Sequence, residues 1–402
     1  MHFTPTYLDV GFDTMVLAEQ DGDGRLDDDY HRDLMAQGLV DWTDLVDQRL
    51  EFRQMAPPEY WNRFSAIPSD LPEEWYSSSW IGDKAVETLE SWDDEGCLLM
   101  VGFVKPHHPF DAPAPWSEMY RPCDLTPRPG WTDSIPAQDL AYGGQYFPFH
   151  DLSEETLRTV MAQYYGSISH IDQQVARMVD VLKRKGLYDD TLIVFTSDHG
   201  EYLGFHHQLL KGGYPYDPLI RVPLIIKFPG PASDARVRDE LVSLIDIAPT
   251  IIRQAGTEPE SHMAGIDLAG STVRREIAFI QGRPGTYVAR SDSHLLILCS
   301  SRDESLLFDL REDPDQVRNL IRDPAAQGIV EEYTEAITRW QLFDTPRPRQ
   351  LDMSASCIVQ PNARPPMGEH RRQMWDYFQH HSAEAGGTQH DGGGRTPSEE
   401  HR

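Results

Sequence analysis

The composition describes a large acidic chain with enough apolar residues for a full core. It has 402 residues, with 36 Lys and Arg against 65 Asp and Glu, and a formal net charge of −29. Such a charge disfavours nucleic acid and anionic membrane surfaces as partners. No run approaches the roughly eighteen consecutive apolar residues that a membrane-spanning helix needs. The four scattered cysteines form neither a disulfide framework nor a zinc motif.

The N-terminal quarter leads from polar, irregular sequence to a helix and a strand. The acidic run 21–29 resembles a calcium loop, but Arg25 stands where the third EF-hand ligand should be, so we interpret it as a solvated loop. Apolar residues at helical spacing predict a helix over 78–92. The apolar run 97–104 predicts a strand that ends at Lys105-Pro106-His107.

The middle of the chain predicts a long loop, a long helix and a buried strand. Residues 111–152 are rich in Pro, Trp and Tyr, and a loop of this length is expected to line a substrate cleft or to wrap over the sheet. Apolar residues spaced by three and four predict an amphipathic helix over 156–185, which Gly186 ends. The apolar run 191–196 predicts a buried strand of a parallel sheet.

Charged and polar residues follow directly after that strand. Asp198 and His199 suit a divalent cation, and Gly200 lets the backbone turn away, although the same residues could form a solvated turn. Ligands bind at the carboxyl ends of strands in open α/β sheets, so the 97–104 and 191–196 strands predict one shared site. Lys211, in the loop before the next predicted strand at 220–226, would bind an anionic substrate or remain a solvated lysine.

The C-terminal part changes character. A helix is predicted over 236–256, and a second one, over 329–342, is expected to pack on a small antiparallel sheet. The strands of that sheet are predicted at 276–281, 286–290, 294–299 and 305–310. Beyond residue 345 the chain is rich in Pro, Gly, His and Arg, and its end is expected to be disordered.

Five ordered segments give this chain its resemblance to a known family. It resembles the sulfatase family of the alkaline-phosphatase-like superfamily, which includes arylsulfatases, choline sulfatases and phosphonate monoester hydrolases. The segments that carry the resemblance are Thr196-Ser197-Asp198-His199-Gly200-Glu201, Lys211-Gly212 with Arg221-Val222-Pro223-Leu224, Gly102 to Phe110 with its Lys-Pro-His-x-Pro-Phe pattern, Ser243 to Thr250, and Leu307-Phe308-Asp309-Leu310 with Asp313-Pro314 and Asn319-Leu320.

The resemblance implies an α/β fold of the alkaline-phosphatase-like type. Its mostly parallel central sheet would be flanked by helices and followed by a small C-terminal antiparallel sheet with a helix. We therefore expect a sulfatase-like α/β domain over 1–260, an α+β subdomain over 261–345 and a tail over 346–402.

The resemblance also implies roles for individual residues. Asp198 and His199 would be two ligands of a divalent metal, with calcium expected and manganese the alternative. Lys105 and Lys211 would hold the ester oxygens, although Lys105 could instead pair with a structural carboxylate. His107 would bind the leaving-group oxygen or a sulfate oxygen and could act as general acid. His2 would neighbour the nucleophile.

The chain departs from the family at its beginning. Sulfatases open with a strand that ends in paired aspartates, followed by a Cys-x-Pro-x-Arg or Cys-x-Ala-x-Arg segment whose cysteine becomes the formylglycine nucleophile. None of Cys97, Cys123, Cys299 and Cys357 is followed by that pattern. The chain opens instead within the family's Gly-Lys-x-His-Phe segment, at His2-Phe3. We therefore expect the N-terminal section to be missing and the chain as written to be inactive.

Three functions remain open from the sequence. The first is a sulfuric ester hydrolase that acts on a small-molecule sulfate ester through a divalent metal and a formylglycine absent from this chain. The second is a phosphonate or phosphate ester hydrolase of the same superfamily, and the third is an inactive, truncated remnant. No signal peptide is visible, which favours a cytoplasmic location, although a missing N-terminus weakens that inference. The sequence leaves the oligomeric state and the substrate alcohol open.

Overall fold

The computed structural model describes residues 7, 10–18, 28–48, 53, 55–93, 96–142, 147–230, 237–270 and 274–344. His2, most of the acidic run 21–29 and the predicted tail 346–402 lie outside these residues. No helix among the described residues is both long and apolar enough to cross a membrane.

Short helices occupy the region that the sequence predicted to be irregular. They are α1 (Asp29–Ala36), α2 (Trp42–Gln48) and α4 (Pro58–Asn62). Asp28 caps α1 by accepting a hydrogen bond from the His31 N–H. Polar residues such as this cap are also common in turns, so the segment looks irregular in sequence although it folds as short helices.

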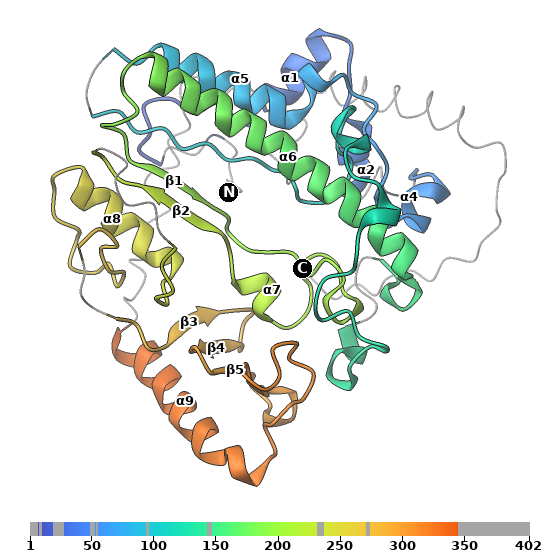
Figure 1. Ribbon diagram of the computed structural model, residues 1–402, viewed down its shortest axis with the longest axis vertical. Coiled ribbons are helices and arrows are strands. Elements are labelled where there is room, and N and C mark those ends of the chain that lie inside the picture. The colour runs from blue at the N-terminus through green and yellow to red at the C-terminus, as the bar shows by residue number, and fades with distance from the viewer. Residues whose placement is uncertain are drawn as a thin grey trace.

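Two helices pack side by side as one layer of the fold. α5 (Ser77–Glu90) and α6 (Glu154–Arg184) confirm the helices predicted at 78–92 and 156–185. They lie side by side in Figure 1. The close approach depends on Gly82, because a Cβ there would lie 2.4 Å from Oε1 of Gln174 on α6. Gly186, at φ +73°, ends α6 in the left-handed conformation that its sequence position predicted.

The long segment between α5 and α6 is built from short turns and wraps over α6. A Cβ on Gly166 of α6 would lie 2.4 Å from the Trp116 carbonyl oxygen, so the glycine admits this wrap. The segment thus covers a helix, where the sequence analysis had expected it to line a cleft or cover the sheet. The 3₁₀ turns around and after it are Glu73–Trp75, Trp116–Glu118, Pro122–Asp124, Ala137–Tyr142, Phe149–Asp151 and Phe205–His207.

The strand predicted at 97–104 is extended but belongs to no sheet among the described residues. Its side chains alternate as in a strand. Val101 and Phe103 pack toward the α5 side, whereas Leu98 and Met100 are 64% and 56% exposed. A ladder needs a second backbone about 4.8 Å away, and no described strand lies beside this segment. The segment therefore has the alternating side chains of a strand, but the prediction that it forms a strand of a sheet is wrong.

The strand predicted at 191–196 is confirmed, but its partner is antiparallel. β1 (Ile193–Thr196) pairs with β2 (Leu224–Lys227), with Val194 opposite Ile226. Within the described residues this pair forms a two-stranded sheet, without the parallel neighbours that were expected. β1 is also less buried than predicted, with Phe195 38% exposed. The short helix α7 (Asp217–Ile220) precedes β2 and lies where the sequence predicted the start of that strand.

The predicted C-terminal sheet is confirmed as a four-stranded antiparallel meander, β3 (Ala278–Gln281), β4 (Tyr287–Arg290), β5 (His294–Leu298) and β6 (Leu306–Asp309). One face, with Leu296 and Leu307, packs on α9 (Gln327–Arg339). The other face, with Val288, Leu295 and Phe308, packs on aromatic residues from 202–216. Because both faces are covered, the sheet shares a core with the larger part of the chain (Figure 1). The domain boundary near residue 260 stays a prediction.

The helix predicted at 236–256 is shorter than expected and begins at a buried carboxylate. A 3₁₀ turn (Leu244–Asp246) leads into α8 (Ile247–Gln254). Asp246 is 0% exposed, and its two oxygens accept hydrogen bonds from both terminal nitrogens of Arg275, at 2.5 and 2.7 Å. The same carboxylate accepts the N–H groups of Ser243 and Ile266. The remaining turns are Arg302–Glu304, Pro324–Ala326 and the π-helical turn Trp340–Asp344.

We predict that Asp246→Ala lowers the free energy of unfolding by about 3–5 kcal/mol, because it leaves the Arg275 guanidinium without its buried counter-charge. Urea unfolding followed by circular dichroism measures the change. The control is Glu258→Ala, which removes an exposed partner of Arg253 on α8 and should leave the midpoint in place. Equal midpoints for both variants would show that Asp246 does not anchor α8.

Candidate functional site

The end of β1 presents Asp198 and His199 on a tight turn. The His199 N–H donates to Asp198 Oδ1 at 2.9 Å, and the Ser197 hydroxyl donates to the His199 carbonyl at 2.7 Å. The next residue must be glycine, because a Cβ on Gly200 would lie 2.0 Å from the Pro218 carbonyl oxygen. The turn therefore holds both side chains at the strand end, with Asp198 85% exposed.

Lys211 reaches the same point from the following loop. Its Nζ lies 3.1 Å from Nε2 of His199, whose Nδ1 lies 2.8 Å from the Gly200 carbonyl oxygen. A carbonyl only accepts, so Nδ1 carries the proton and Nε2 accepts from the Lys211 ammonium. Three residues that the sequence predicted to act together thus meet at one place.

Glu201 holds the loop that carries Lys211. Its Oε1 accepts the Leu203 N–H at 3.3 Å and also the N–H of Leu210, the residue before Lys211. Burial raises the pKa of Glu201 to about 7, although these two hydrogen bonds act in the opposite direction. One carboxyl group therefore ties together both ends of the 203–210 segment.

His107 lies within electrostatic reach of this cluster. Its Nδ1 lies 2.6 Å from the His108 carbonyl oxygen. Burial is the largest cause that lowers the pKa of His107 to about 2, and the neighbouring His108 and Lys211 act in the same direction. The ring is therefore neutral, with its proton on Nδ1. That the 105–107 and 198–199 segments share one site stays a prediction.

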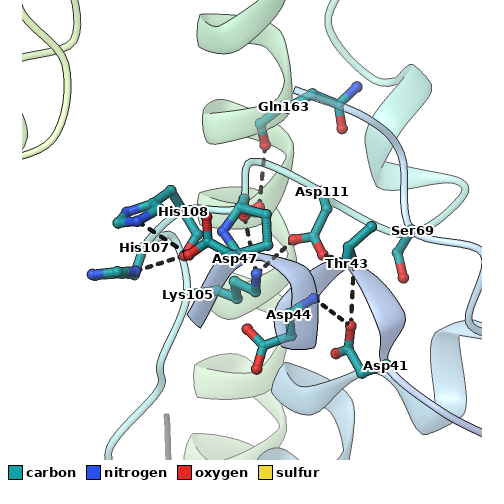
Figure 2. Close-up of polar contacts among 12 residues, drawn as sticks. Asp41, Thr43, Asp44, Asp47, Ser69, Lys105, His107, His108, Asp111 and Gln163 are labelled. Atoms are coloured by element: carbon teal, nitrogen blue, oxygen red, sulfur yellow. Dashed lines mark hydrogen bonds and ion pairs between the residues drawn. The ribbon is translucent and has the colours of Figure 1, made fainter. Parts of the chain in front are cut away.

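Lys105 points elsewhere, into a buried ion pair. It is 3% exposed, and its Nζ donates to Asp111 Oδ1 at 2.5 Å and to the Pro109 carbonyl at 3.0 Å. Asp111 also accepts a hydrogen bond from Thr43 (Figure 2) and another from Tyr76. A buried ammonium has to be paired, so the structure gives Lys105 the carboxylate-bound alternative in place of contact with an ester oxygen.

Two further aspartates surround this pair. Burial alone would lower the pKa of Lys105, but attraction from Asp111, Asp44 and Asp41 raises it above its ordinary value. Burial and repulsion from Asp44 and Asp111 raise the pKa of Asp41 to about 7. Asp41 Oδ1 accepts the Thr43 hydroxyl and the Asp44 N–H, both at 3.2 Å.

Several residues around the site have no role that a motif marks in the sequence. Asp111 pairs with Lys105, Asp47 contacts His108, His108 contacts His107, and Glu201 holds the residue before Lys211. Asp47 lies 60 residues before His107, and no spacing rule connects them. His2 lies outside the described residues, so its predicted role was not tested.

The residues present do not by themselves fit the metal that the resemblance implies. Asp198 and His199 offer one carboxylate and one imidazole, whereas a hard divalent cation takes about six oxygen-type ligands. Among the residues that the structure describes, no group of three His, Cys, Asp or Glu side chains gathers at one point. The His199 Nε2 lone pair is also engaged by Lys211.

The raised pKa of Asp41 predicts a pH-dependent stability. The folded state holds the proton up to about pH 7, whereas an unfolded Asp loses it near its ordinary pKa of 3.8. The stabilising contribution is therefore present at low pH and is lost as pH rises toward 7. We compare the free energy of unfolding of Asp41→Asn with that of wild type. The variant should gain stability relative to wild type as pH rises from about 5 to 7.5, because wild type loses the contribution of protonated Asp41. Urea titrations at a series of pH values measure it, and a constant difference would contradict the assignment.

We predict that Ca²⁺ and Mn²⁺ bind the 402-residue chain no more tightly than the millimolar range, because two ligands cannot replace the hydration shell of such an ion. Isothermal calorimetry measures the affinity, with His199→Ala as the control. Micromolar binding that survives His199→Ala would place the metal at other residues. Micromolar binding that this variant abolishes would show that further ligands complete the Asp198–His199 pair.

Comparisons with known proteins match this chain to one family. The sulfatase family model matches residues 27–257, which is more than half of the chain. The multifunctional alkaline phosphatase superfamily protein PehA of Trinickia caryophylli is 30% identical over 70% of this chain and 62% of its own length. The arylsulfatase of Clostridium perfringens is 30% identical over 69% of this chain and 58% of its own length. The chain thus spans about three fifths of the length of these relatives.

A solved structure agrees in fold. The phosphonate monoester hydrolase of Agrobacterium radiobacter superposes with a TM-score of 0.64 and 24% identity, over 78% of this chain and 68% of that one. The fold is therefore alkaline-phosphatase-like, as the sequence predicted. From the family model, these relatives and the strand-end cluster of Asp198, His199 and Lys211, we conclude that the chain belongs to the sulfatase family.

Proposed function

We propose that this chain binds a sulfate monoester in the manner of a sulfuric ester hydrolase, with Lys211 as the substrate-binding cation. The observation that carries the proposal is the exposed ammonium of Lys211 at the end of β1, 3.1 Å from Nε2 of His199. The protein has a net charge of −29, so an anionic ester needs a local positive charge to bind. Lys211 supplies that charge at the strand end.

Lys211 would compensate the negative charge on the nonbridging sulfate oxygens, which is where preorganised electrostatics contributes most to catalysis. His107 would have a different role from the predicted one. Its proton is on Nδ1 and points to the His108 carbonyl, so Nε2 is the accepting nitrogen of a neutral ring. That arrangement suits acceptance of a hydrogen bond at Nε2, whereas a pKa of about 2 makes the ring a weak base and leaves no proton on Nε2 for a general acid to donate.

The nucleophile and the complete metal site are not assigned to described residues. Family members generally use a divalent metal, to which Asp198 and His199 would contribute two ligands, with calcium or manganese as the ion. By resemblance the nucleophile is a formylglycine. Cys97 and Cys123 are exposed and Cys299 is half-buried, but none is followed by the Cys-x-Pro-x-Arg pattern.

Hydrolysis of a phosphonate or phosphate ester is the alternative within the same superfamily. It is favoured by the similarity to PehA, whose name describes a multifunctional member of the superfamily. A tetrahedral phosphonate would meet the same cation, because the charge and the geometry of its oxygens resemble those of a sulfate. Competition between the two esters for binding at Lys211 distinguishes the two candidates.

We expect p-nitrophenyl sulfate to bind the intact chain and Lys211→Met to weaken binding by roughly ten- to a hundredfold, as for loss of one charge-assisted hydrogen bond. Calorimetry measures binding, and Lys183→Met, which changes an exposed lysine on α6, is the control. Release of p-nitrophenol should not exceed that of a blank, because none of the four cysteines is followed by the pattern from which the formylglycine nucleophile is made.

Three results would change this proposal. Equal binding by Lys211→Met and wild type would remove Lys211 from the site. Stronger competition by a p-nitrophenyl phosphonate monoester would favour the alternative activity. Turnover that Asp198→Ala abolishes would show that a residue of this chain does serve as the nucleophile.

A further inference from the structure

We propose that Asp47 and His108 form a positioning pair that fixes the ring of His107. The pair does not contact substrate in this proposal; it acts through His107, and its catalytic relevance rests on the proposed function. Figure 2 shows Asp47, His107 and His108 gathered beside the buried Lys105–Asp111 ion pair.

The first step is the fixation of Asp47. This residue belongs to α2, and its side chain is 0% exposed. Its Oδ1 accepts the Tyr60 hydroxyl, and its Oδ2 lies 3.1 Å from Nε2 of His108. Contacts on both oxygens leave the carboxylate little freedom to rotate. Asp47 therefore holds the His108 ring from a rigid helix.

The second step passes this restraint to His107. The two imidazole rings stack with centroids 4.1 Å apart and planes inclined by 25°. Nδ1 of His107 lies 2.6 Å from the His108 backbone oxygen. The carbonyl holds one edge of the ring, and the stacked His108 restricts rotation about the Cβ–Cγ bond. Neither contact alone fixes both the edge and the face of His107.

The consequence is chemical as well as structural. With the ring held, the proton stays on Nδ1 and Nε2 remains an acceptor. A ring that turned away from the carbonyl could carry its proton on either nitrogen. The positioning pair therefore selects the one tautomer in which Nε2 is a hydrogen-bond acceptor.

The fold contains a matched arrangement that serves as a control. The Tyr216 hydroxyl donates to Asp139 Oδ1 at 2.9 Å, and Asp139 Oδ2 lies 2.8 Å from Nδ1 of the buried His206. This is also a Tyr–Asp–His chain with a buried carboxylate. It differs in that the ring of His206 is not stacked on His107. Removing the negative charge of Asp139 should therefore leave the His107 tautomer unchanged.

The experiment is a long-range ¹H–¹⁵N correlation spectrum of the full chain labelled at histidine, with the His107 signals assigned by their loss in His107→Gln. We expect wild-type His107 to show one protonated and one bare nitrogen. Asp47→Asn should move the two nitrogen shifts toward each other, as a mixture of tautomers forms. His108→Phe, which keeps a flat ring but loses the contact with Asp47, should do the same. Asp139→Asn should leave His107 unchanged.

Each outcome decides the inference. A single Nδ1-protonated tautomer that survives in Asp47→Asn or His108→Phe would overturn it, as would a wild-type His107 protonated on Nε2. If Asp47→Asn does not fold, His108→Phe alone is decisive, since it keeps the buried carboxylate. The spectrum needs no substrate, so a failure of p-nitrophenyl sulfate to bind would count against the proposed function and not against the positioning pair.

Discussion

The site depends on the burial of one ion pair, Lys105 with Asp111. Removing two charges from water costs several kcal/mol per ion, and the pair is tolerated only because further groups complete its hydrogen bonds. Thr43 and Tyr76 donate to Asp111, and the Pro109 carbonyl accepts from Lys105. These contacts fix the 105–111 turn against α2 and α5. His107 lies inside that turn, so its position follows from an interaction in which it takes no part.

The second constraint comes from the C-terminal sheet. Tyr202 and Phe205 precede Lys211 in the chain and Tyr214 and Tyr216 follow it, and all four pack on the sheet face that contains Val288 and Phe308. Arg283, between β3 and β4, also donates to the Gly212 carbonyl at 2.6 Å. The loop of Lys211 is therefore held on both sides by a core that forms only when the two parts of the chain pack together. Glu201 completes this restraint from within the loop.

The electrostatics of the site are local and opposite to those of the whole protein. Among the residues described at the end of β1, the exposed Lys211 contributes a full positive charge, and His107 stays neutral partly because of that charge. A neutral imidazole beside an ammonium can accept a hydrogen bond while the ammonium binds an anion. The two groups differ in charge because of their positions, since both are cations or potential cations in isolation.

Much of the fold and part of the site could be predicted from the sequence. Apolar periodicity determined α5, α6, β1 and the four C-terminal strands, because the spacing of buried residues is a local property. The Asp198-His199-Gly200 turn was likewise readable, since Gly200 is needed where the Pro218 carbonyl approaches. The resemblance of five segments also identified the family correctly.

Only the tertiary structure decided how these segments meet. The antiparallel pairing of β1, the unpaired 97–104 segment and the burial of Lys105 all depend on residues distant in sequence. The sequence left two roles open for Lys105, an ester oxygen or a structural carboxylate. It pairs with the carboxylate of Asp111, to which Thr43 and Tyr76 also donate. Asp47 had no motif to mark it, because a positioning contact needs only proximity in space. The sequence determines the chemistry of each side chain. The hydrogen-bond partners, burial and protonation of that side chain are determined only when distant segments pack together.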